Sequence, residues 1–320
     1  MELQIIKTSL NKFCIAACLV FAGVELCSDV SDHLKSCLNK AEHHRIKNID
    51  FIYMINLDQR PEKWRRSLEQ LLPYQIFPYR FSAVNGWELS VETIHDVGLK
   101  YSPEMNGGFM GTSYFAHSNV EPSHELIQNY GQTYFCHCLS RGAIGISLSH
   151  LSILKDALDS GYETIWVMED DIEILENPHL LSEMVEKLDQ CVGPGNWDIL
   201  FTDQDIRDKE KHYKPCFWAA RRPDFGNSIQ QLNDYSLRRD LSEDFRQIGA
   251  RWGAHSMIVR RSGMKKILQF FFAHQIFFPY DMEYILPPGI KLFNTRKDIV
   301  SNLTTASSDN GGPNYLNGSL

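Results

Sequence analysis

Three consecutive carboxylates, Glu169, Asp170 and Asp171, follow an apolar run in the stretch TIWVMEDDIEIL. Adjacent like charges cost free energy unless a cation, hydrogen-bond donors or open water offset them. Side chains alternate along an extended backbone, so we expect Glu169 and Asp171 on one side and Asp170 on the other. Two carboxylates on one side can share a divalent ion. A solvated acidic turn at a strand end is the alternative interpretation.

A hard divalent ion such as Mg²⁺ or Mn²⁺ takes one or two carboxylates and completes its shell with water and phosphate oxygens. An acidic cluster of this kind therefore suits a nucleotide diphosphate, whose charge the metal neutralises as it departs. The later stretch WDILFTDQD gives a second acidic strand end, with Asp203 and Asp205. In open α/β sheets, ligands bind beyond the carboxyl ends of the strands, where both clusters are expected.

Strand and helix patterns alternate around these residues. The run DFIYMINL predicts a buried strand, Pro61 suits the first turn of the next helix, and YRFSAVNG predicts a second strand. A long helix, RGAIGISLSHLSILKDALDSG, then leads into the strand that carries the acidic triplet. This alternation predicts an α/β domain with a mostly parallel central sheet flanked by helices.

We expect this single domain to cover residues 49–300. Residues 95–137 and 207–245 show no steady hydrophobic period and are interpreted as irregular excursions from it. Residues 28–48 form a linker or helix before the domain. The Ser-, Asn- and Gly-rich residues 301–320 are expected to form a flexible tail.

The amino terminus has a pattern of its own. Two lysines precede the apolar run FCIAACLVFAGV, which is short for a membrane span but fits the apolar core of a signal peptide. Residues 1–27 are therefore interpreted as a signal peptide or membrane anchor, with a lipoprotein-like site at Cys18 or a buried helix as alternatives. Export, anchoring or a secretory lumen is favoured over a membrane-associated cytoplasmic location.

The overall charge narrows the class of partner. A formal net charge of -8 argues against a nucleic-acid binder, which concentrates Lys and Arg to release counterions. Eight cysteines without paired CxxC spacing do not settle the redox compartment. The CHC sequence at 136–138 lacks a second ligand pair, so it does not by itself predict a metal site.

Three blocks in order along the chain resemble glycosyltransferase family 25, which contains bacterial lipopolysaccharide galactosyltransferases and procollagen galactosyltransferases. The first block is IYMINLDQRPEKW followed by YRFSAVNG, and the second is GAIGISLSHLSILKDALDSGYETIWVMEDDIEIL. The third, less specific block is WGAHSMIVRRSGMKKIL followed by PYDMEY. Two departures stand out, because Asn85 and Ile146 occupy positions where the family usually has Asp and often has Cys.

The resemblance implies the nucleotide-diphosphosugar transferase fold called GT-A. It also implies transfer of a hexose, galactose or glucose, from a UDP-sugar to a hydroxyl of a glycan, lipopolysaccharide or protein acceptor, with Mn²⁺ or Mg²⁺ as cofactor. Asp171 is then the direct metal ligand and Glu169 its helper. The residues implied for the donor site are Asn56, Leu57, Asp58, Arg60, Asn85, Ser149, His150 and Asp170.

The family chemistry resembles inverting transfer, in which a carboxylate takes the acceptor proton. Asp281 and Asp203 are the candidates for this base, with Glu169 as a base-side neighbour. A helix cap or a salt bridge is the alternative role for Asp281 and Asp203. His150 either contacts donor phosphate or satisfies a hydrogen bond in the core.

Two other functions fit parts of the sequence. The first is a glycosyltransferase-like binding module that has kept its shape and lost turnover, which export away from UDP-sugars would favour. The second is a metal-dependent phosphotransferase, because paired aspartates at strand ends also serve phosphoryl transfer. The chain carries no glycine-rich P-loop and no DxDxT-like nucleophile motif, which ranks the phosphotransferase below the other two.

Overall fold

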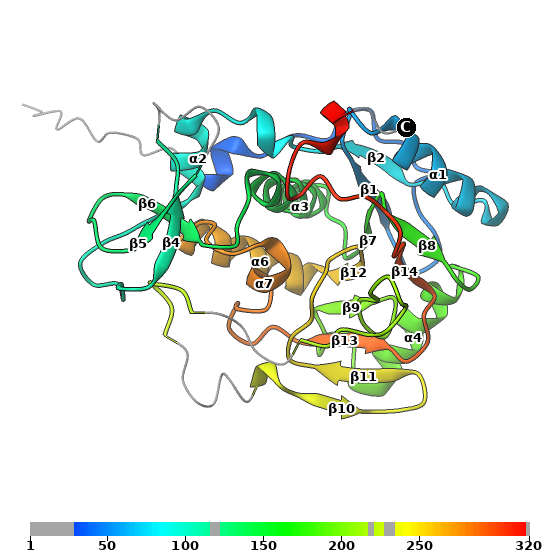
Figure 1. The fold of residues 1–320 in the computed structure, drawn as a ribbon. Coiled ribbons are helices and arrows are strands. Elements are labelled where there is room, and N and C mark those ends of the chain that lie inside the picture. The colour runs from blue at the N-terminus through cyan, green and yellow to red at the C-terminus, as the bar shows by residue number, and fades with distance from the viewer. Residues whose placement is uncertain (1–28, 116–121, 217–220, 227–233, 318–320) are drawn as a thin grey trace, which may run out of the picture.

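A computed structural model describes residues 29–115, 122–216, 221–226 and 234–317, as drawn in Figure 1. The predicted signal or anchor segment, 1–27, lies outside the described residues. The expected linker contains one short 3-10 helix, η1 (Val30–His33). No helix in the described ranges combines the length and apolar character needed to cross a membrane.

The centre of the fold is an eight-stranded sheet with the strand order β10-β11-β13-β9-β12-β7-β1-β2. Its strands are β1 (Phe51–Asn56), β2 (Tyr79–Ser82), β7 (Thr164–Glu169), β9 (Ile199–Phe201), β10 (Arg238–Asp240), β11 (Phe245–Ile248), β12 (Ser256–Arg260) and β13 (Leu292–Thr295). Strand β1 is buried along its whole length, because both faces of the sheet are covered there.

The prediction of a mostly parallel sheet is wrong. The pairs β1–β2, β1–β7 and β9–β13 are parallel. The other four pairs are antiparallel, and β12 lies antiparallel to both β7 and β9. Parallel neighbours are usually joined by a single crossover helix, whereas the chain between β9 and β12 forms the antiparallel pair β10–β11, so the strand-helix alternation behind the prediction does not continue there. The fold is therefore mixed α/β.

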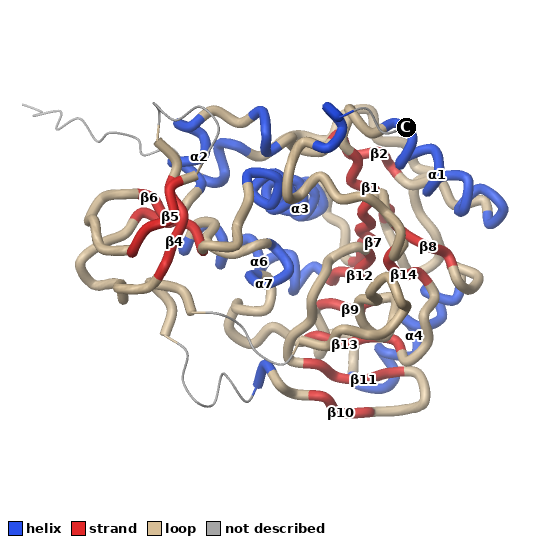
Figure 2. The backbone as a smooth tube through the Cα atoms, viewed as in Figure 1, coloured by secondary structure: helices blue, strands red, loops and turns tan. Residues whose placement is uncertain are grey.

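Helices cover both faces of this sheet, as Figure 2 shows. On one face α3 (Arg141–Asp159), α6 (Arg261–His274) and α7 (Tyr280–Glu283) share a core with one set of alternating strand residues. On the other face α1 (Pro61–Leu71) and α4 (Leu180–Val192) pack against the opposite set. Trp166 and Val167, neighbours in β7, point into opposite cores, as the period of two requires.

The first predicted strand-helix-strand unit is confirmed. Strands β1 and β2 pair in parallel and α1 connects them, beginning at Pro61 as expected. The short 3-10 helices η2 (Leu72–Tyr74) and η3 (Gly86–Glu88) follow α1 and β2. Asn85 caps η3 by accepting a hydrogen bond from the Trp87 amide nitrogen over 3.1 Å. This unit brings the ends of β1 and β2 next to the start of η3.

The excursion at 95–137 is more regular than its sequence indicates. After α2 (Val91–Val97), it forms a four-stranded antiparallel sheet in the order β3-β6-β4-β5. These strands are β3 (Leu99–Lys100), β4 (Met110–Ser113), β5 (Ser123–Leu126) and β6 (Thr133–Cys136). The strands have at most four residues, which is too short for a hydrophobic period to be legible. Within 207–245, the described residues include β10 and the start of β11.

Residues 301–317 are anchored, in contrast to the flexible tail expected from the composition of 301–320. Strand β14 (Val300–Asn302) pairs with β8 (Ile172–Ile174), directly after the acidic triplet. The following residues, 303–317, cross the ends of β1 and α1 and finish in η4 (Asn314–Asn317), drawn in red in Figure 1. We call residues 303–317 the C-terminal strap.

Candidate active site

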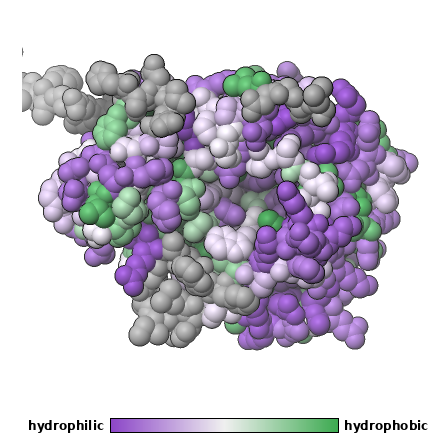
Figure 3. Space-filling view, in the orientation of Figure 1, coloured by the Kyte–Doolittle hydropathy of each residue, from purple (hydrophilic) through white to green (hydrophobic). Residues whose placement is uncertain are grey.

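A cavity of about 100 Å³ lies at the carboxyl ends of β1, β2 and β7. The amino-terminal half of α3 and the C-terminal strap close its other sides. The lining residues are Ile55, Leu57, Lys63, Ala83, Val84, Asn85, Gly86, Trp87, Gly142, Ile146, Ser149, Glu169, Asp170, Asp171, Ser308, Asp309 and Asn310. The face seen in Figure 3 is hollowed near its centre, between the four-stranded sheet β3-β6-β4-β5 and the strands of the central sheet. The acidic triplet therefore borders a cavity shared with the first strand.

Helix α3 can approach this cavity closely because of its glycines. A Cβ atom on Gly145 would lie 2.5 Å from the Val84 carbonyl oxygen and from the Gly86 nitrogen. One turn later, the Ser149 hydroxyl accepts a hydrogen bond from the Val84 nitrogen over 2.8 Å. The Gly-x-x-x-Ser spacing thus places the bare backbone of Gly145 and the small side chain of Ser149 against the loop that follows β2.

Glu169 is held by histidine on the inner side of the cavity. His150 Nε2 lies 3.0 Å from Glu169 Oε1, and the His150 ring stacks on Tyr280 at 4.2 Å between centroids. Burial opposes ionisation, but this hydrogen bond and the charges of His150, His255 and Lys63 hold the pKa of Glu169 below its usual value. Glu169 is therefore ionised at neutral pH.

Asp170 lines the same cavity as Glu169 and Asp171, in contrast to the alternation expected of an extended strand, because β7 ends at Glu169 and the backbone bends at Asp170. Asn56 Nδ2 donates to its Oδ2 over 2.6 Å, and Lys63 Nζ lies 4.0 Å from its Oδ1. Burial raises the pKa of Asp170 to about 7, with a further contribution from the negative charge of Asp171. This carboxyl therefore titrates near neutral pH.

Asp171 has an unsatisfied acceptor. Its Oδ1 is buried and, among the described residues, has no hydrogen-bond partner. Burial and the charge of Glu169 both raise the pKa of Asp171, whereas the positive charges of His255 and Lys63 lower it. An orphaned carboxylate oxygen beside a second carboxylate is an arrangement that a bound cation would satisfy.

The carboxylates of Glu169 and Asp171 are a suitable pair of ligands for a divalent cation. No group of three or more His, Cys, Asp or Glu side chains that could hold a metal occurs in the described part of the chain. A Mg²⁺-type ion, however, needs only one or two protein carboxylates when phosphates and water supply the remaining ligands. Glu169 and Asp171 fit that reduced set, with oxygen donors of the type that hard cations prefer.

Asp281 lies near Glu169, in the first turn of α7. Its Oδ2 accepts a hydrogen bond from the Gly253 nitrogen over 2.8 Å. Burial and the negative charge of Glu169 raise the pKa of Asp281, despite this hydrogen bond and the positive charge of His150. A carboxylate with a raised pKa is a stronger proton acceptor than an ordinary one.

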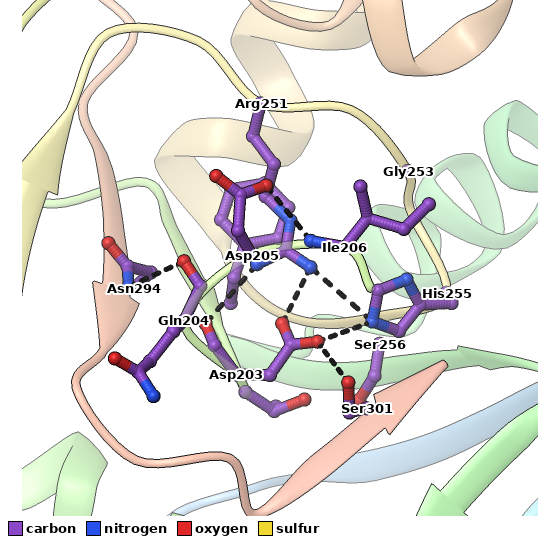
Figure 4. Close-up of polar contacts among 12 residues, drawn as sticks. Asp203, Gln204, Asp205, Ile206, Arg251, Gly253, His255, Ser256, Asn294 and Ser301 are labelled. Carbon is purple, nitrogen blue, oxygen red and sulfur yellow. Dashed lines mark hydrogen bonds and ion pairs between the residues drawn. The ribbon is translucent and has the colours of Figure 1, made fainter. Parts of the chain in front are cut away.

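Asp203, the other candidate base, is buried and bound by other side chains of the protein. It has no exposed surface and pairs with Arg251 Nη2 at 2.6 Å and His255 Nε2 at 2.9 Å, while the Ser301 hydroxyl donates to it over 2.7 Å. Figure 4 shows these three partners converging on its carboxylate. Burial opposes ionisation, but the charges of Arg251 and His255 lower the pKa of Asp203 to about 2. This makes Asp203 a structural anion rather than a base within reach of an acceptor.

Arg60 also differs from its expected role. Its guanidinium donates twice to Asp309 of the strap, from Nε over 2.7 Å and from Nη2 over 2.6 Å. Arg60 is 2% exposed and is absent from the cavity lining. It therefore attaches the C-terminal strap instead of presenting its charge to a ligand.

The structure brings together about half of the predicted site residues. The residues that line the cavity are Leu57, Asn85, Ser149, Glu169, Asp170 and Asp171. Asn56 and His150 lie behind the cavity lining and hold Asp170 and Glu169, respectively. Asp58 lies away from the lining, 61% exposed at its side chain and paired with Arg80 at 2.9 Å.

Several cavity residues were not identified from the sequence. Lys63 follows Arg60 by one helical turn, and this spacing was an available signal. Trp87 lines the cavity and donates from Nε1 to the Asp309 carbonyl over 2.8 Å. Ser308, Asp309 and Asn310 come from a segment whose composition indicates only a loop.

The chain belongs to glycosyltransferase family 25, described as a family of lipopolysaccharide biosynthesis proteins. The family model matches residues 49–283, which is most of the chain. The match includes the acidic triplet and Asp281, and ends before the C-terminal strap.

Individual relatives agree with this assignment, although their sequence identity to this chain is low. A glycosyltransferase 25 family member of Aedes aegypti is 25% identical over 54% of this chain and 24% of its own length. The procollagen galactosyltransferase 1 of Danio rerio is 25% identical over 48% of this chain and 21% of its own length. A human relative named inactive glycosyltransferase 25 family member 3 is 24% identical over 51% of this chain and 23% of its own length. The aligned part of this chain thus spans about a quarter of each relative.

Proposed function

We propose that this protein is a hexosyltransferase that moves galactose or glucose from a UDP-sugar to a hydroxyl of a glycan, lipopolysaccharide or protein acceptor. The observation that carries the proposal is the cavity at the ends of β1, β2 and β7, which Glu169 and Asp171 both line and where the Asp171 Oδ1 atom is buried without a hydrogen-bond partner among the described residues. Family membership supports the transferase class, and the procollagen galactosyltransferase relative supports galactose. The finer assignment of the fold is the GT-A type.

The charge of the cavity supports a metal-dependent reaction. Four carboxylates line it, and they are Glu169, Asp170, Asp171 and Asp309. Lys63 is the only cationic side chain among the lining residues, all of which belong to the described part of the chain. A sugar nucleotide adds the negative charge of its diphosphate, so it would be repelled without a compensating cation. Mn²⁺ or Mg²⁺ held by Asp171 and Glu169 would supply that charge and stabilise the leaving diphosphate.

The remaining roles follow from position. Leu57, Asn85 and Ser149 line the donor side of the cavity, and Lys63 adds a positive charge beside Asp170. His150 fixes the orientation of Glu169. Asp281, with its raised pKa, is our candidate for the base that takes the acceptor proton in an inverting transfer. Attack from the face opposite the leaving diphosphate would invert the sugar carbon.

A screen of UDP-hexoses with and without Mn²⁺ tests this function. Hydrolysis or transfer should require both a UDP-sugar and the metal, and Asp171→Ala should abolish it. Asp159→Ala is the matched control, because Asp159 is an aspartate on the surface of α3 whose side chain is 62% exposed. Turnover that survives in Asp171→Ala at the wild-type level would overturn the metal assignment.

A catalytically silent binding module is the second candidate. It is favoured by the relatives of human and mouse that are named inactive. This alternative predicts saturable UDP-sugar binding with no turnover of any hexose donor in either metal condition. The same screen, followed by a binding measurement, therefore separates the two candidates.

A further inference from the structure

Cys136 and Cys138 form a close thiol pair beside the candidate active site. Their sulfur atoms lie 3.1 Å apart at the end of β6. The backbone turns between them, because the Leu139 nitrogen donates to the Cys136 carbonyl over 3.1 Å. This turn brings side chains two positions apart to the same side, which an extended strand would also do but at a greater separation.

The two thiols differ in access. Cys136 is buried at 4% exposure, whereas Cys138 is exposed. The hydrogen bond with Cys136 lowers the pKa of Cys138 to about 7, against the effect of its partial burial. Burial raises the pKa of Cys136. An accessible thiolate beside a shielded thiol is the usual division between an attacking and a resolving cysteine.

The pair also lies next to two parts of the candidate active site, helix α3 and the segment that carries Asp281. The Cys136 nitrogen donates to the Phe277 carbonyl over 2.9 Å, three residues before Tyr280. Ser140, two residues after Cys138, caps α3 by accepting from the Ala143 nitrogen over 3.0 Å. The negative charge of Asp281 acts on the Cys138 thiol. A covalent change at this turn is therefore transmitted to both α3 and the segment that carries Asp281.

We propose that Cys136 and Cys138 are an oxidative modification site, which low-molecular-weight disulfides convert reversibly into an internal disulfide that alters the neighbouring carboxylate site. The Cys138 thiolate attacks one sulfur of glutathione disulfide, which forms a mixed disulfide and releases one glutathione thiolate. Cys136 loses its proton to water and attacks the Cys138 sulfur, which releases the second glutathione thiolate. The protein loses two electrons, and the oxidant gains them as two thiols.

A disulfide across a tight turn with one exposed sulfur, that of Cys138, belongs to the labile class, so dithiothreitol should reverse it. The effect on the carboxylate site rests on the proposed function, whereas formation of the disulfide does not. The two parts can therefore be tested separately.

Peptide mapping provides the first test. Trypsin cleaves after Lys100 and Arg141, and the peptide 101–141 contains Cys136 and Cys138 without any other cysteine. After incubation of the intact protein with glutathione disulfide and then iodoacetamide, this peptide should be lighter by two hydrogens and unalkylated. Dithiothreitol should restore double alkylation. A stable glutathione adduct on wild-type Cys138, or two alkylated cysteines without prior reduction, would overturn the proposal.

Single variants define the order of the steps. Cys136→Ser should stop at a glutathione adduct on Cys138, and Cys138→Ser should leave Cys136 unmodified in the folded protein. Cys191→Ser removes another exposed thiol and should leave the internal disulfide unchanged, which makes it the matched control. Rapid modification of Cys136 in Cys138→Ser would contradict the assigned roles.

Two readouts test the transmission to the active site. Oxidation should change amide exchange in residues 276–283 and should lower UDP-hexose turnover at least several-fold, and neither change should occur in Cys138→Ser. Identical exchange and turnover in the oxidised and reduced protein would overturn the transmission. If the disulfide forms and alters exchange but neither form turns over a UDP-hexose, the proposed function fails and the modification site stands.

Discussion

Arg60 and Asp309 form a two-pronged ion pair that joins the end of the first strand to the C-terminal strap. Their atoms approach to 2.6 and 2.7 Å, and their side chains are only 3% and 7% exposed. Lys63 adds a second cation, with its Nζ 3.6 Å from Asp309 and 2.6 Å from the Ser307 carbonyl. This cluster makes the strap a wall of the candidate donor cavity.

Replacing Asp309 should therefore destabilise the protein. Asp309→Ala removes two short charge-assisted hydrogen bonds from the buried guanidinium of Arg60, and removal of one member of a buried pair typically costs about 3–5 kcal/mol. The free energy of unfolding, measured by urea denaturation, should fall by an amount in this range. Asp159→Ala breaks the exposed pair with Lys155 and should cost about 0.5 kcal/mol or less. Equal losses in the two variants would show that the strap is not held by this pair.

Much of this site could be predicted from local sequence, and the strap could not. The acidic triplet was correctly placed at a strand end, because the apolar residues of β7 are buried and the strand ends at Glu169. The expected alternation of its side chains did not hold, because the backbone bends at Asp170 and all three carboxylates line the cavity. Asn85 and Ser149 were placed on the cavity through their motifs. Asp309 pairs with a residue 249 positions away, and no local pattern records such a contact.

The same limit explains the two errors of role. Arg60 follows a strand in a motif that resembles a donor-binding block, but its partner comes from the far end of the chain. Asp203 lies at a strand end, as a catalytic carboxylate would, yet Arg251, His255 and Ser301 surround it in the folded chain. The antiparallel orientation of β12 relative to its neighbours could not be predicted either, because the sequence of a five-residue strand does not indicate its direction in the sheet.

The ion pairs of Asp203 should make the free energy of unfolding decrease at acidic pH. Its pKa of about 2 lies below the ordinary value of 3.8, so its contribution is fully present above about pH 4 and is lost as the pH falls toward 2. This contribution corresponds to roughly 2 kcal/mol at about 1.4 kcal/mol per pKa unit. The unfolding free energies of the wild type and Asp203→Asn should therefore converge by about this amount between pH 4 and 2. Parallel pH profiles would contradict the ion-pair assignment.

The buried carboxyl of Asp170 should have the opposite effect, so that its contribution to the free energy of unfolding falls as the pH rises toward neutral. Its pKa is raised from 3.8 to about 7, so the folded state binds the extra proton and loses stability as the pH rises from about 4 to 7. Asp170→Asn lacks this titration and should gain stability relative to the wild type across that interval, by up to a few kcal/mol. Denaturation curves at several pH values measure the gain. A difference that does not vary with pH would refute the shifted pKa.

The close contact at Gly145 should make the cavity wall sensitive to any added side-chain volume at this position. A Cβ atom there would lie 2.5 Å from backbone atoms of Val84 and Gly86, so Gly145→Ala must push α3 away from the loop after β2. We expect a loss of about 1–3 kcal/mol in unfolding free energy, together with weaker donor binding. Gly195→Ala is the control, because no heavy atom lies within 4 Å of the added methyl group. A Gly145→Ala protein as stable as the control would contradict the close approach of α3.

Isothermal titration calorimetry with UDP-hexoses tests the central claim most directly, because it reports donor binding whether or not the protein turns over. Wild-type protein should bind a UDP-hexose in the presence of Mn²⁺ and lose measurable binding when the metal is chelated. Asp171→Ala should bind weakly in both conditions, and Asp159→Ala should behave like the wild type. Equally tight donor binding by Asp171→Ala with and without Mn²⁺ would contradict a site in which the paired carboxylates act through a divalent cation.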